Sequence, residues 1–293
     1  MSLCLFEILS IDILVIIAFI VSLRKKKLTM SGALSALFIG ISVSFAGFEY
    51  LIIMLAFFVS STKATDIHRE IKRQLLGDSY TKEKQRNATQ VLCKGFFPTI
   101  ISLIIALKYN SKMFLFSTEN NTLKFLYGIY IGFYVSANAD TWASELGINS
   151  DALPIYIGSF QQVPKGINGA VSLYGTVMSV LGGGFIAFTS VVCSMLRALE
   201  LVPIEKVLEI IILGMFCGFL GSMIDSILGA TLQISMYDNE KKCVVDKEEV
   251  DMNSIDMKRY KIYGRDYLNN SMVNLITGVL TSLISGELFY LIL

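Results

Sequence analysis

The chain contains a series of long apolar stretches with few or no charges, and these limit most strongly what it can fold into. A helix needs about 20 mostly apolar residues to cross a bilayer. Eight stretches approach that length, and they cover residues 6–23, 28–46, 48–62, 91–108, 124–139, 169–195, 207–229 and 272–293. Only 17% of the 293 residues are charged, where a soluble domain carries roughly 25%. We therefore expect an all-α integral membrane protein, a bundle of about eight transmembrane helices that forms one polytopic domain over residues 1–293.

Three of these stretches leave room for re-entrant or broken helices. Stretches 28–46 and 48–62 are short and are separated only by Gly47, which suits a tight hairpin or a re-entrant pair. Stretch 169–195 contains three consecutive glycines at 182–184, which either break a helix or let a neighbour pack closely. The first stretch is followed by a basic cluster at 24–27, the reverse of a signal peptide, so we expect it to remain as a span.

The basic residues fix an expected orientation, because cytoplasmic loops are enriched in Lys and Arg. With eight spans, one side receives the loops at 24–28, 63–94, 140–168 and 230–268, which hold 20 of the 25 basic residues. We therefore expect basic cytosolic loops at 63–90 and 231–268. The net charge of +1 gives no overall basic field, so no nucleic-acid partner is expected. The five cysteines and the single histidine form no zinc-binding set.

The densest polar cluster continues the fifth stretch, over residues 136–147. If it is helical, Asn138 and Glu145 share a face, with Asp140 on the adjacent stripe. Carboxylates beside amide and hydroxyl oxygens suit a hard cation such as Mg²⁺, which takes one or two carboxylates together with substrate phosphates. A helix end wetted by lipid headgroups is the simpler alternative.

A second cluster, at 163–172, places Lys165 beside Gly166, Asn168 and Gly169 at the start of an expected helix. Backbone N–H groups at a helix start, together with a lysine, can hold a phosphate. A glycine-rich turn before a span is equally common, so the pattern alone leaves both readings open.

A third cluster centres on Asp225, with Ser226 beside it, inside an apolar span. A carboxylate at that depth is costly and usually functional. Asp140 and Asp225 both lie near the cytoplasmic end of a span and both precede a hydroxyl residue, so we expect them to share one divalent cation. Asn270 and Asn274 enter the last span four residues apart, where they would orient phosphate or metal or hold helices together.

Arg86 and Asn87 stand close to the point where the basic loop returns to the membrane, so they are candidates for ligand contact, although such loops usually only hold topology and touch anionic lipid. These motifs together resemble the transmembrane protein 19 family, also called domain-of-unknown-function family 92. The resemblance is carried by residues 85–87, 138–147, 163–169 and 221–233, in the family's order, and runs from about residue 25 to the end.

The resemblance implies a multi-pass membrane protein. Its plant relatives include phytyl-phosphate kinases, which add a second phosphate to a prenyl monophosphate. On that reading Asp140, Glu145 and Asp225 would hold Mg²⁺, and the catalytic set would be Asp140, Asp225 and Lys165. The residues expected to bind or orient phosphates are Arg86, Asn87, Asn138, Gly166, Asn168, Gly169, Ser226, Asn270 and Asn274. The co-substrate would be a nucleoside triphosphate, CTP or ATP, and the lipid tail would lie between spans.

Asn269 departs from the family pattern, because relatives commonly carry an acidic residue at this position, so a charge is missing if the position binds metal. Two other functions remain open from the residues alone. An intramembrane aspartate and glycine-rich spans also suit an ion-coupled transporter, and a non-catalytic membrane scaffold would use the same motifs for packing. A cytosolic-face enzyme is favoured because nearly all the motifs fall on one side. In a eukaryotic cell we expect an endomembrane such as the endoplasmic reticulum.

Overall fold

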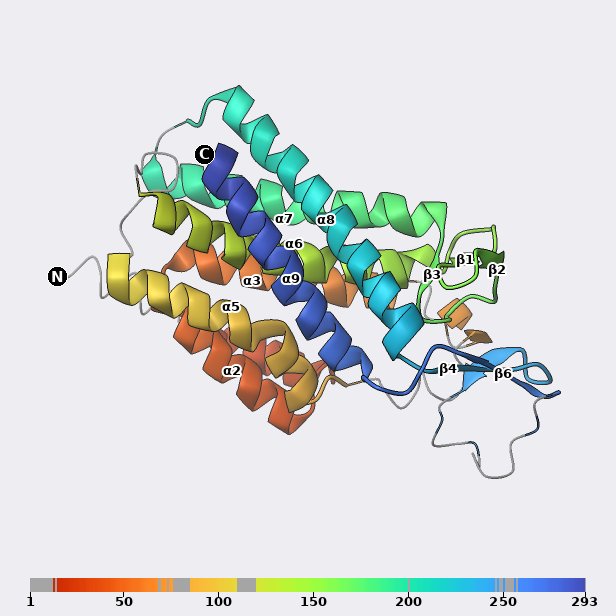
Figure 1. The fold of residues 1–293 in the computed structure, drawn as a ribbon. Helices are drawn as coiled ribbons and strands as arrows, with labels where there is room; N and C mark the ends of the chain where they lie inside the picture. The colour runs from red at the N-terminus through yellow and green to blue at the C-terminus, as the bar shows by residue number, and fades with distance from the viewer. Residues whose placement is uncertain are drawn as a thin grey trace.

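The computed structural model describes residues 15–67, 85–109, 120–199, 201–245 and 258–292, together with positions 13, 70–72, 74, 75, 247, 250 and 256. An N-terminal helix, Val15–Arg24, begins the described chain. The long helices follow as α2 (Met30–Ser44), α3 (Phe48–Asp66), α5 (Ala88–Tyr109), α6 (Asn121–Gly147), α7 (Leu173–Ala198), α8 (Ile204–Leu232) and α9 (Asn270–Ile292). Each of the eight predicted stretches has a helix within the described residues, and the predicted all-α bundle is confirmed (Figure 1).

The two irregular regions are resolved as ordinary helices. Gly47, at a positive φ of 138°, turns the chain between α2 and α3, which are therefore separate helices joined by a tight turn. The three glycines at 182–184 lie within the unbroken helix α7. A side chain at Gly183 would meet the backbone of Gly214 on α8, so these glycines let two helices pack closely.

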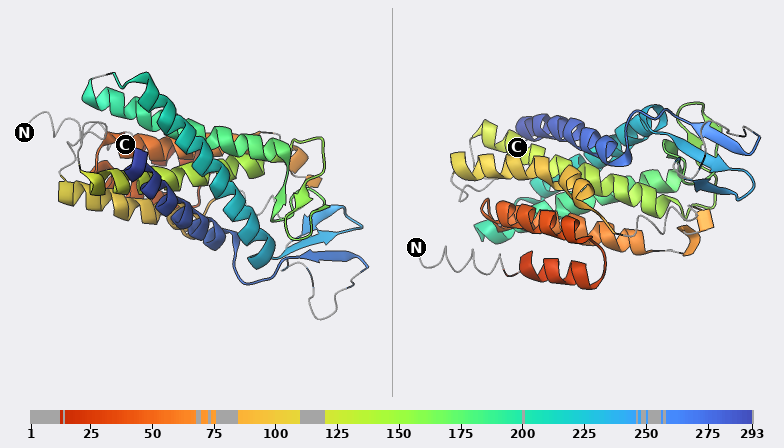
Figure 2. Two further views of the ribbon diagram at one scale, coloured as in Figure 1. Left: turned by 45° about the horizontal axis from the view of Figure 1, so that its top comes forward. Right: turned by 90° about the horizontal axis from the view of Figure 1, so that it is seen from below.

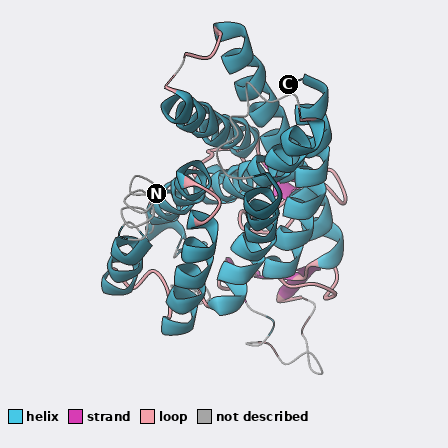
Figure 3. Ribbon diagram, turned by 90° about the vertical axis from the view of Figure 1, so that its left-hand side faces the viewer, coloured by secondary structure: helices cyan, strands magenta, loops and turns pink. Residues whose placement is uncertain are grey.

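Helix α6 is the central element of the bundle. It packs against α3, α5, α7, α8 and α9, and every residue from Tyr127 to Ala139 is buried. Within the described residues, five helices are long and apolar enough to cross a membrane by length and composition: α3, α5, α7, α8 and α9. Because α6 is enclosed by other helices, it can carry the polar residues at 136–147 that an outer helix would expose to lipid. Figures 2 and 3 show the surrounding helices from other sides.

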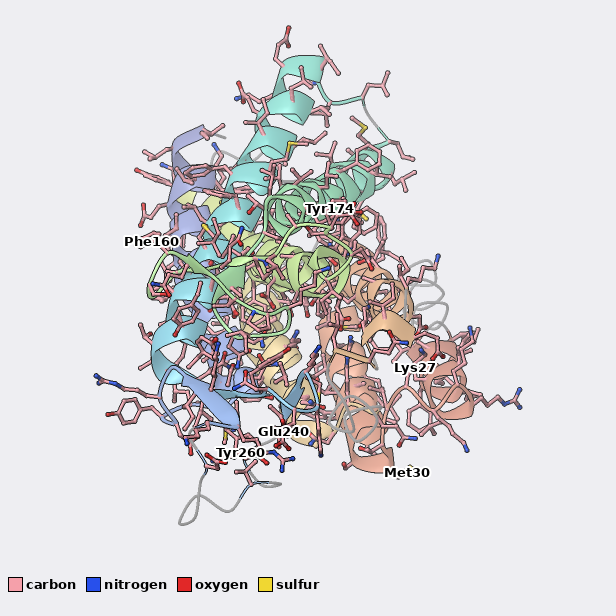
Figure 4. All side chains as sticks on the ribbon, turned by 90° about the vertical axis from the view of Figure 1, so that its right-hand side faces the viewer. Lys27, Met30, Phe160, Tyr174, Glu240 and Tyr260 are labelled. Carbon is pink, nitrogen blue, oxygen red and sulfur yellow. The ribbon has the colours of Figure 1, made fainter. Side chains whose placement is uncertain are left out.

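The loops predicted to share one side meet at one end of the bundle, which faces the viewer in Figure 4. Lys27 pairs with Asp66 at the end of α3, and Leu28 bridges to Arg86 before α5. The backbone N–H of Asn168 donates to Ser235 Oγ at 3.0 Å, which joins the loop before α7 to the loop after α8. These contacts bring described parts of the loops together at one end, whereas their cytosolic placement stays a prediction.

Two small antiparallel sheets cover this end, at the right of Figure 1. The first has the strand order β2-β1-β3, and the second β5-β4-β6. Their strands are β1 (Ile155–Tyr156), β2 (Gln161–Gln162), β3 (Ala170–Val171), β4 (Ser235–Asp238), β5 (Cys243–Val245) and β6 (Tyr260–Tyr263). The rings of Tyr156 and Tyr263 lie 5.4 Å apart and join the sheets. The segment 231–268 is therefore partly a folded cap, not only a basic loop, and strands of two to four residues are too short to leave an alternating pattern in the sequence.

Candidate functional site

Two carboxylates from different helices meet inside the bundle. Asp140 on α6 and Asp225 on α8 lie within hydrogen-bonding reach of each other, and both residues are half-buried. Gly221 on α8 explains the approach, because a Cβ there would lie 2.5 Å from Ser136 Oγ on α6. Gly221 and Ser136 each stand four residues, about one turn, before one of the aspartates. The close contact of the two helices therefore sets the two carboxylates side by side one turn later.

Lys94 on α5 and Thr277 on α9 complete the surroundings of this pair. The ammonium of Lys94 lies close enough to interact electrostatically with Asp140 and Asp225, and more distantly with Glu145. Thr277 Oγ1 donates to Asp225 Oδ2 at 3.3 Å. Helices α5, α6, α8 and α9 thus each contribute one polar side chain to a single place.

Arg86 approaches the same region from the edge of the bundle. Its backbone is fixed on both sides, because Arg86 N donates to the Lys27 carbonyl and its own carbonyl accepts from Thr29 N. Burial lowers the pKa of Arg86, and the nearby carboxylates of Glu145 and Asp66 only partly oppose that shift. Arg86 stands just before α5 and Lys94 lies in the second turn of that helix, close enough for their charges to interact. Among the described residues neither forms an ion pair within 4 Å.

Both cations line a mostly apolar cavity. The space enclosed together with its open mouth is about 770 Å³. Its walls come from the N-terminal helix, α2, α3, the first turns of α5, and Tyr134 of α6. The polar side chains on these walls are few: Ser22, Arg86, Gln90, Lys94 and Tyr134. Lys94 therefore stands between an apolar cavity and the Asp140–Asp225 pair. We refer to Arg86, Lys94, Asp140 and Asp225 as the charged centre.

Glu145 is held by other partners. Its carboxylate pairs with the fully buried Lys72 at 2.7 Å and accepts a hydrogen bond from Thr65 Oγ1 at 3.0 Å. Lys72 also donates to two carbonyls at the end of α3. Within the described part of the chain, no three His, Cys, Asp or Glu side chains gather closely enough to hold a metal ion. The expected three-carboxylate metal set is therefore not assembled, because Glu145 joins α6 to α3 and to Lys72.

Two of the predicted ligand-binding amides are occupied by the protein itself. Asn138 is fully buried; its Oδ1 accepts from Ser60 and Ser61 of α3, and its Nδ2 donates to the carbonyl of Gly182 at 2.8 Å. It joins three helices and has no access to a ligand. Asn87 exchanges reciprocal hydrogen bonds with Gln90 and caps the start of α5.

The predicted phosphate turn lies against the cap. Lys165 Nζ donates to the carbonyl oxygens of Ile148 and Ser150, just after α6 ends. Gly166 and Gly169 both have positive φ, and Gly169 packs against Ala230 at the end of α8. Asn168 bonds to Ser235 and Ile234. This turn therefore joins the ends of α6 and α8, and the hydrogen bonds of Lys165 and Asn168 go to neighbouring loop atoms.

The polar residues at the start of α9 lie on one stripe. Asn274 Nδ2 donates to the Asn270 carbonyl at 2.7 Å, and Gln233 at the end of α8 donates weakly to Asn270 Oδ1. Thr277 stands three residues after Asn274, so Asn270, Asn274 and Thr277 share one face of α9. Thr277 on this face contacts Asp225. Asn269 Oδ1 accepts from Met272 N and caps the helix. The missing acidic residue at 269 therefore removes no ligand from the charged centre. Ser226 follows Asp225 and is half-buried.

Sequence reasoning missed Lys94 and Thr277. Lys94 was counted with the basic loop, although it stands in the first turns of an apolar stretch, where an ionisable residue is itself a functional signal. Thr277 carried no such signal, because a threonine in an apolar helix is common and only the fold places it beside Asp225.

Comparison with known proteins agrees with the membrane bundle. Residues 13–282 match the family described as "Integral membrane protein DUF92". The chain is 35% identical to Protein PGR of Arabidopsis thaliana over 269 residues, which is 90% of both chains. It is 27% identical to an uncharacterized membrane protein of Methanocaldococcus jannaschii, over 83% of this chain and 88% of that one. No solved structure matches.

Proposed function

This chain belongs to the DUF92 family of integral membrane proteins, and we propose that it is a membrane-embedded phosphotransferase that acts on an isoprenoid monophosphate. The observation that carries the proposal is the position of Lys94, which lines the apolar cavity and also interacts with Asp140 and Asp225. A ligand at that position needs an apolar part and an anionic part.

The cations support binding of a phosphate. A lysine or arginine in a transmembrane helix costs about 2.5–3.5 kcal/mol at the helix centre, and such residues usually pair with an opposite charge. Arg86 and Lys94 form no ion pair within 4 Å among the described residues, and burial lowers the pKa of Arg86. Because neither side chain is fixed in such a pair, a phosphate between them can accept charge-assisted hydrogen bonds from each.

The carboxylate pair fits a magnesium ion. Two carboxylates this close repel each other when both are ionised, and Mg²⁺ takes one or two carboxylates together with phosphate oxygens and water. Asp140 and Asp225 would hold the ion, and Thr277 would orient Asp225 through its hydrogen bond. Bound there, the ion would neutralise the charge that develops on the transferred phosphoryl group.

The proposed reaction forms one P–O bond and breaks one. A phosphate oxygen of the prenyl monophosphate attacks the γ-phosphorus of a nucleoside triphosphate, and the bond from that phosphorus to the bridging oxygen breaks as the nucleoside diphosphate leaves. Arg86 and Lys94 hold the accepting phosphate. Such transfers depend mainly on positioning and on charge stabilisation, and a buried cluster of fixed charges supplies both. ATP and CTP both fit this chemistry as donors. The excess of basic residues at this end supports a site on the cytosolic face, in a eukaryotic cell that of an endomembrane.

Purified protein in lipid nanodiscs tests the proposal. It is incubated with radiolabelled ATP or CTP, Mg²⁺ and dimethylallyl, geranyl, farnesyl or phytyl monophosphate, and labelled prenyl diphosphate is separated by chromatography. We expect product with at least one acceptor, none with excess EDTA, and strong loss in Asp225→Asn. Glu209→Gln is the matched control, because Glu209 is also an acidic residue of α8 but pairs with Lys206 away from the site.

Two results would overturn the proposal. The first is the absence of product with every donor and acceptor from a folded sample. The second is uptake of an ion into sealed vesicles that depends on Asp225 without any phosphoryl transfer, which would favour the ion-coupled transporter.

A further inference from the structure

The N-terminal helix has two different faces. Ile16, Ile17 and Ile20 are 49%, 50% and 41% exposed on its outer side, which suits contact with lipid. Val15 and Ser22 are 4% exposed and lie on the opposite side. That inner face, with Ala18 and Phe19, forms one wall of the apolar cavity.

The other walls make the cavity amphiphilic. Leu37 and Ile39 of α2 and Met54 and Phe58 of α3 supply apolar surface. Gln90 and Lys94 lie one turn apart on α5, and Arg86 directly precedes that helix, so the polar side chains of this wall come from the start of α5. Ser22 on the facing helix already donates its hydroxyl to the Ala18 carbonyl. The polar functions available to a ligand are thus concentrated on the wall that adjoins Asp140 and Asp225.

The N-terminal helix is fixed in place by close packing. A Cβ at Gly40 of α2 would lie 2.7 Å from Val15 Cγ1, so the two helices are in direct contact at this point. The helix therefore closes the cavity on the side where its own isoleucines are exposed.

We propose that the apolar tail of the lipid phosphate occupies this cavity, against the inner face of the N-terminal helix, with its phosphate at Lys94. The inference rests on the proposed function and adds the place where the tail is recognised. The cavity is continuous with the two cations, and its walls offer a buried apolar chain contact on several sides. A space lined in this way holds water poorly, so a hydrocarbon chain suits it better than a second hydrophilic substrate.

Tryptophan substitutions on the two faces of the same helix test the inference. Val15→Trp and Ala18→Trp place a large ring in the cavity, whereas Ile16→Trp and Ile17→Trp place the same ring in lipid. For farnesyl monophosphate we expect kcat/KM to fall about tenfold or more in the inner-face variants, as expected for a blocked apolar pocket. For dimethylallyl monophosphate, whose tail is a single five-carbon unit, the fall should be much smaller. The outer-face variants should match the parent with both substrates.

A binding measurement keeps the inference testable where an inner-face variant does not fold. Farnesyl monophosphate with a photoreactive group at the far end of its tail is cross-linked to the parent protein, and labelled peptides are identified by mass spectrometry. We expect labelling within residues 15–22 and 36–58, and competition by unlabelled farnesyl monophosphate. Labelling confined to α7 and α8, or equal effects of inner-face and outer-face variants, would overturn the tail site. If the parent neither binds nor phosphorylates any prenyl phosphate, the proposed function fails instead.

Discussion

Asp140 of α6 and Asp225 of α8 lie within hydrogen-bonding reach of each other, and the close contact of Gly221 with Ser136 one turn earlier explains why. Such a pair acts as a unit if it shares one cation. We therefore expect Asp140→Asn, Asp225→Asn and the double variant to lose about the same activity, because groups that work together are non-additive. Initial rates at saturating Mg²⁺ measure this. Losses that multiply in the double variant would show two independent roles.

Lys94 and Arg86 should contribute to affinity for phosphate. Each charge-assisted hydrogen bond is worth roughly 1.5–3 kcal/mol, so Lys94→Met and Arg86→Gln should each weaken binding of a prenyl monophosphate by about 10- to 150-fold. Equilibrium binding in nanodiscs without nucleotide measures the change. Lys206→Gln, which removes a lysine at the other end of α8, is the control and should bind as the parent does.

Asn138 should matter for stability and not for ligand contact. Asn138→Ala removes the hydrogen bonds to Ser60, Ser61 and Gly182 in a buried place, and buried groups left unpaired cost about 1–3 kcal/mol each. Titration with a denaturing detergent should show an earlier unfolding transition. A variant with parental stability but lost phosphate affinity would restore the ligand role that the sequence suggested.

Lys165 has one role predicted from the sequence and another indicated by its hydrogen bonds in the structure. A phosphate ligand at this position predicts weaker binding in Lys165→Ala, whereas its bonds to the Ile148 and Ser150 carbonyls predict a looser segment after α6. We expect faster amide hydrogen exchange in residues 155–171 with unchanged affinity for phosphorylated ligands. Slower binding or lower affinity with unchanged exchange would favour the phosphate role.

The cap should lose stability in acid. Burial would raise the pKa of Asp238, but hydrogen bonds from Arg259 and from the N–H groups of Lys241 and Glu240 outweigh it and hold the pKa below its ordinary value. A carboxyl with a lowered folded-state pKa stabilises the fold above the unfolded value of about 3.9 and loses that contribution as the pH falls further. Proteolysis within residues 235–263 should therefore increase below that pH. In Asp238→Asn it should be faster at neutral pH and less dependent on pH.

The bundle was predictable because each span leaves its own apolar stretch in the sequence. The helix at 121–147 is the informative case, since its polar second half continues as helix only because α6 is surrounded by other helices. The strands of the two small sheets were not predictable, because two-residue strands such as Ile155–Tyr156 are too short to leave an alternating pattern.

The site was predictable in part. The cost of a carboxylate in a span singled out Asp140 and Asp225, and the same reasoning applied to Lys94 would have found the cation. The roles of Glu145, Asn138 and Lys165 depend on the residues that surround them in the fold. Glu145 pairs with Lys72, Asn138 accepts a hydrogen bond from Ser60, and Lys165 donates to the Ile148 carbonyl. Motif spacing and composition do not identify these partners.

The charged centre is tested most directly by cryo-electron microscopy of the nanodisc-embedded protein with farnesyl monophosphate and Mg²⁺. The account predicts phosphate density in contact with Arg86 and Lys94, ion density between Asp140 and Asp225, and tail density along the N-terminal helix. Phosphate density at Lys165 with an empty charged centre, in a sample shown to bind the lipid, would contradict it.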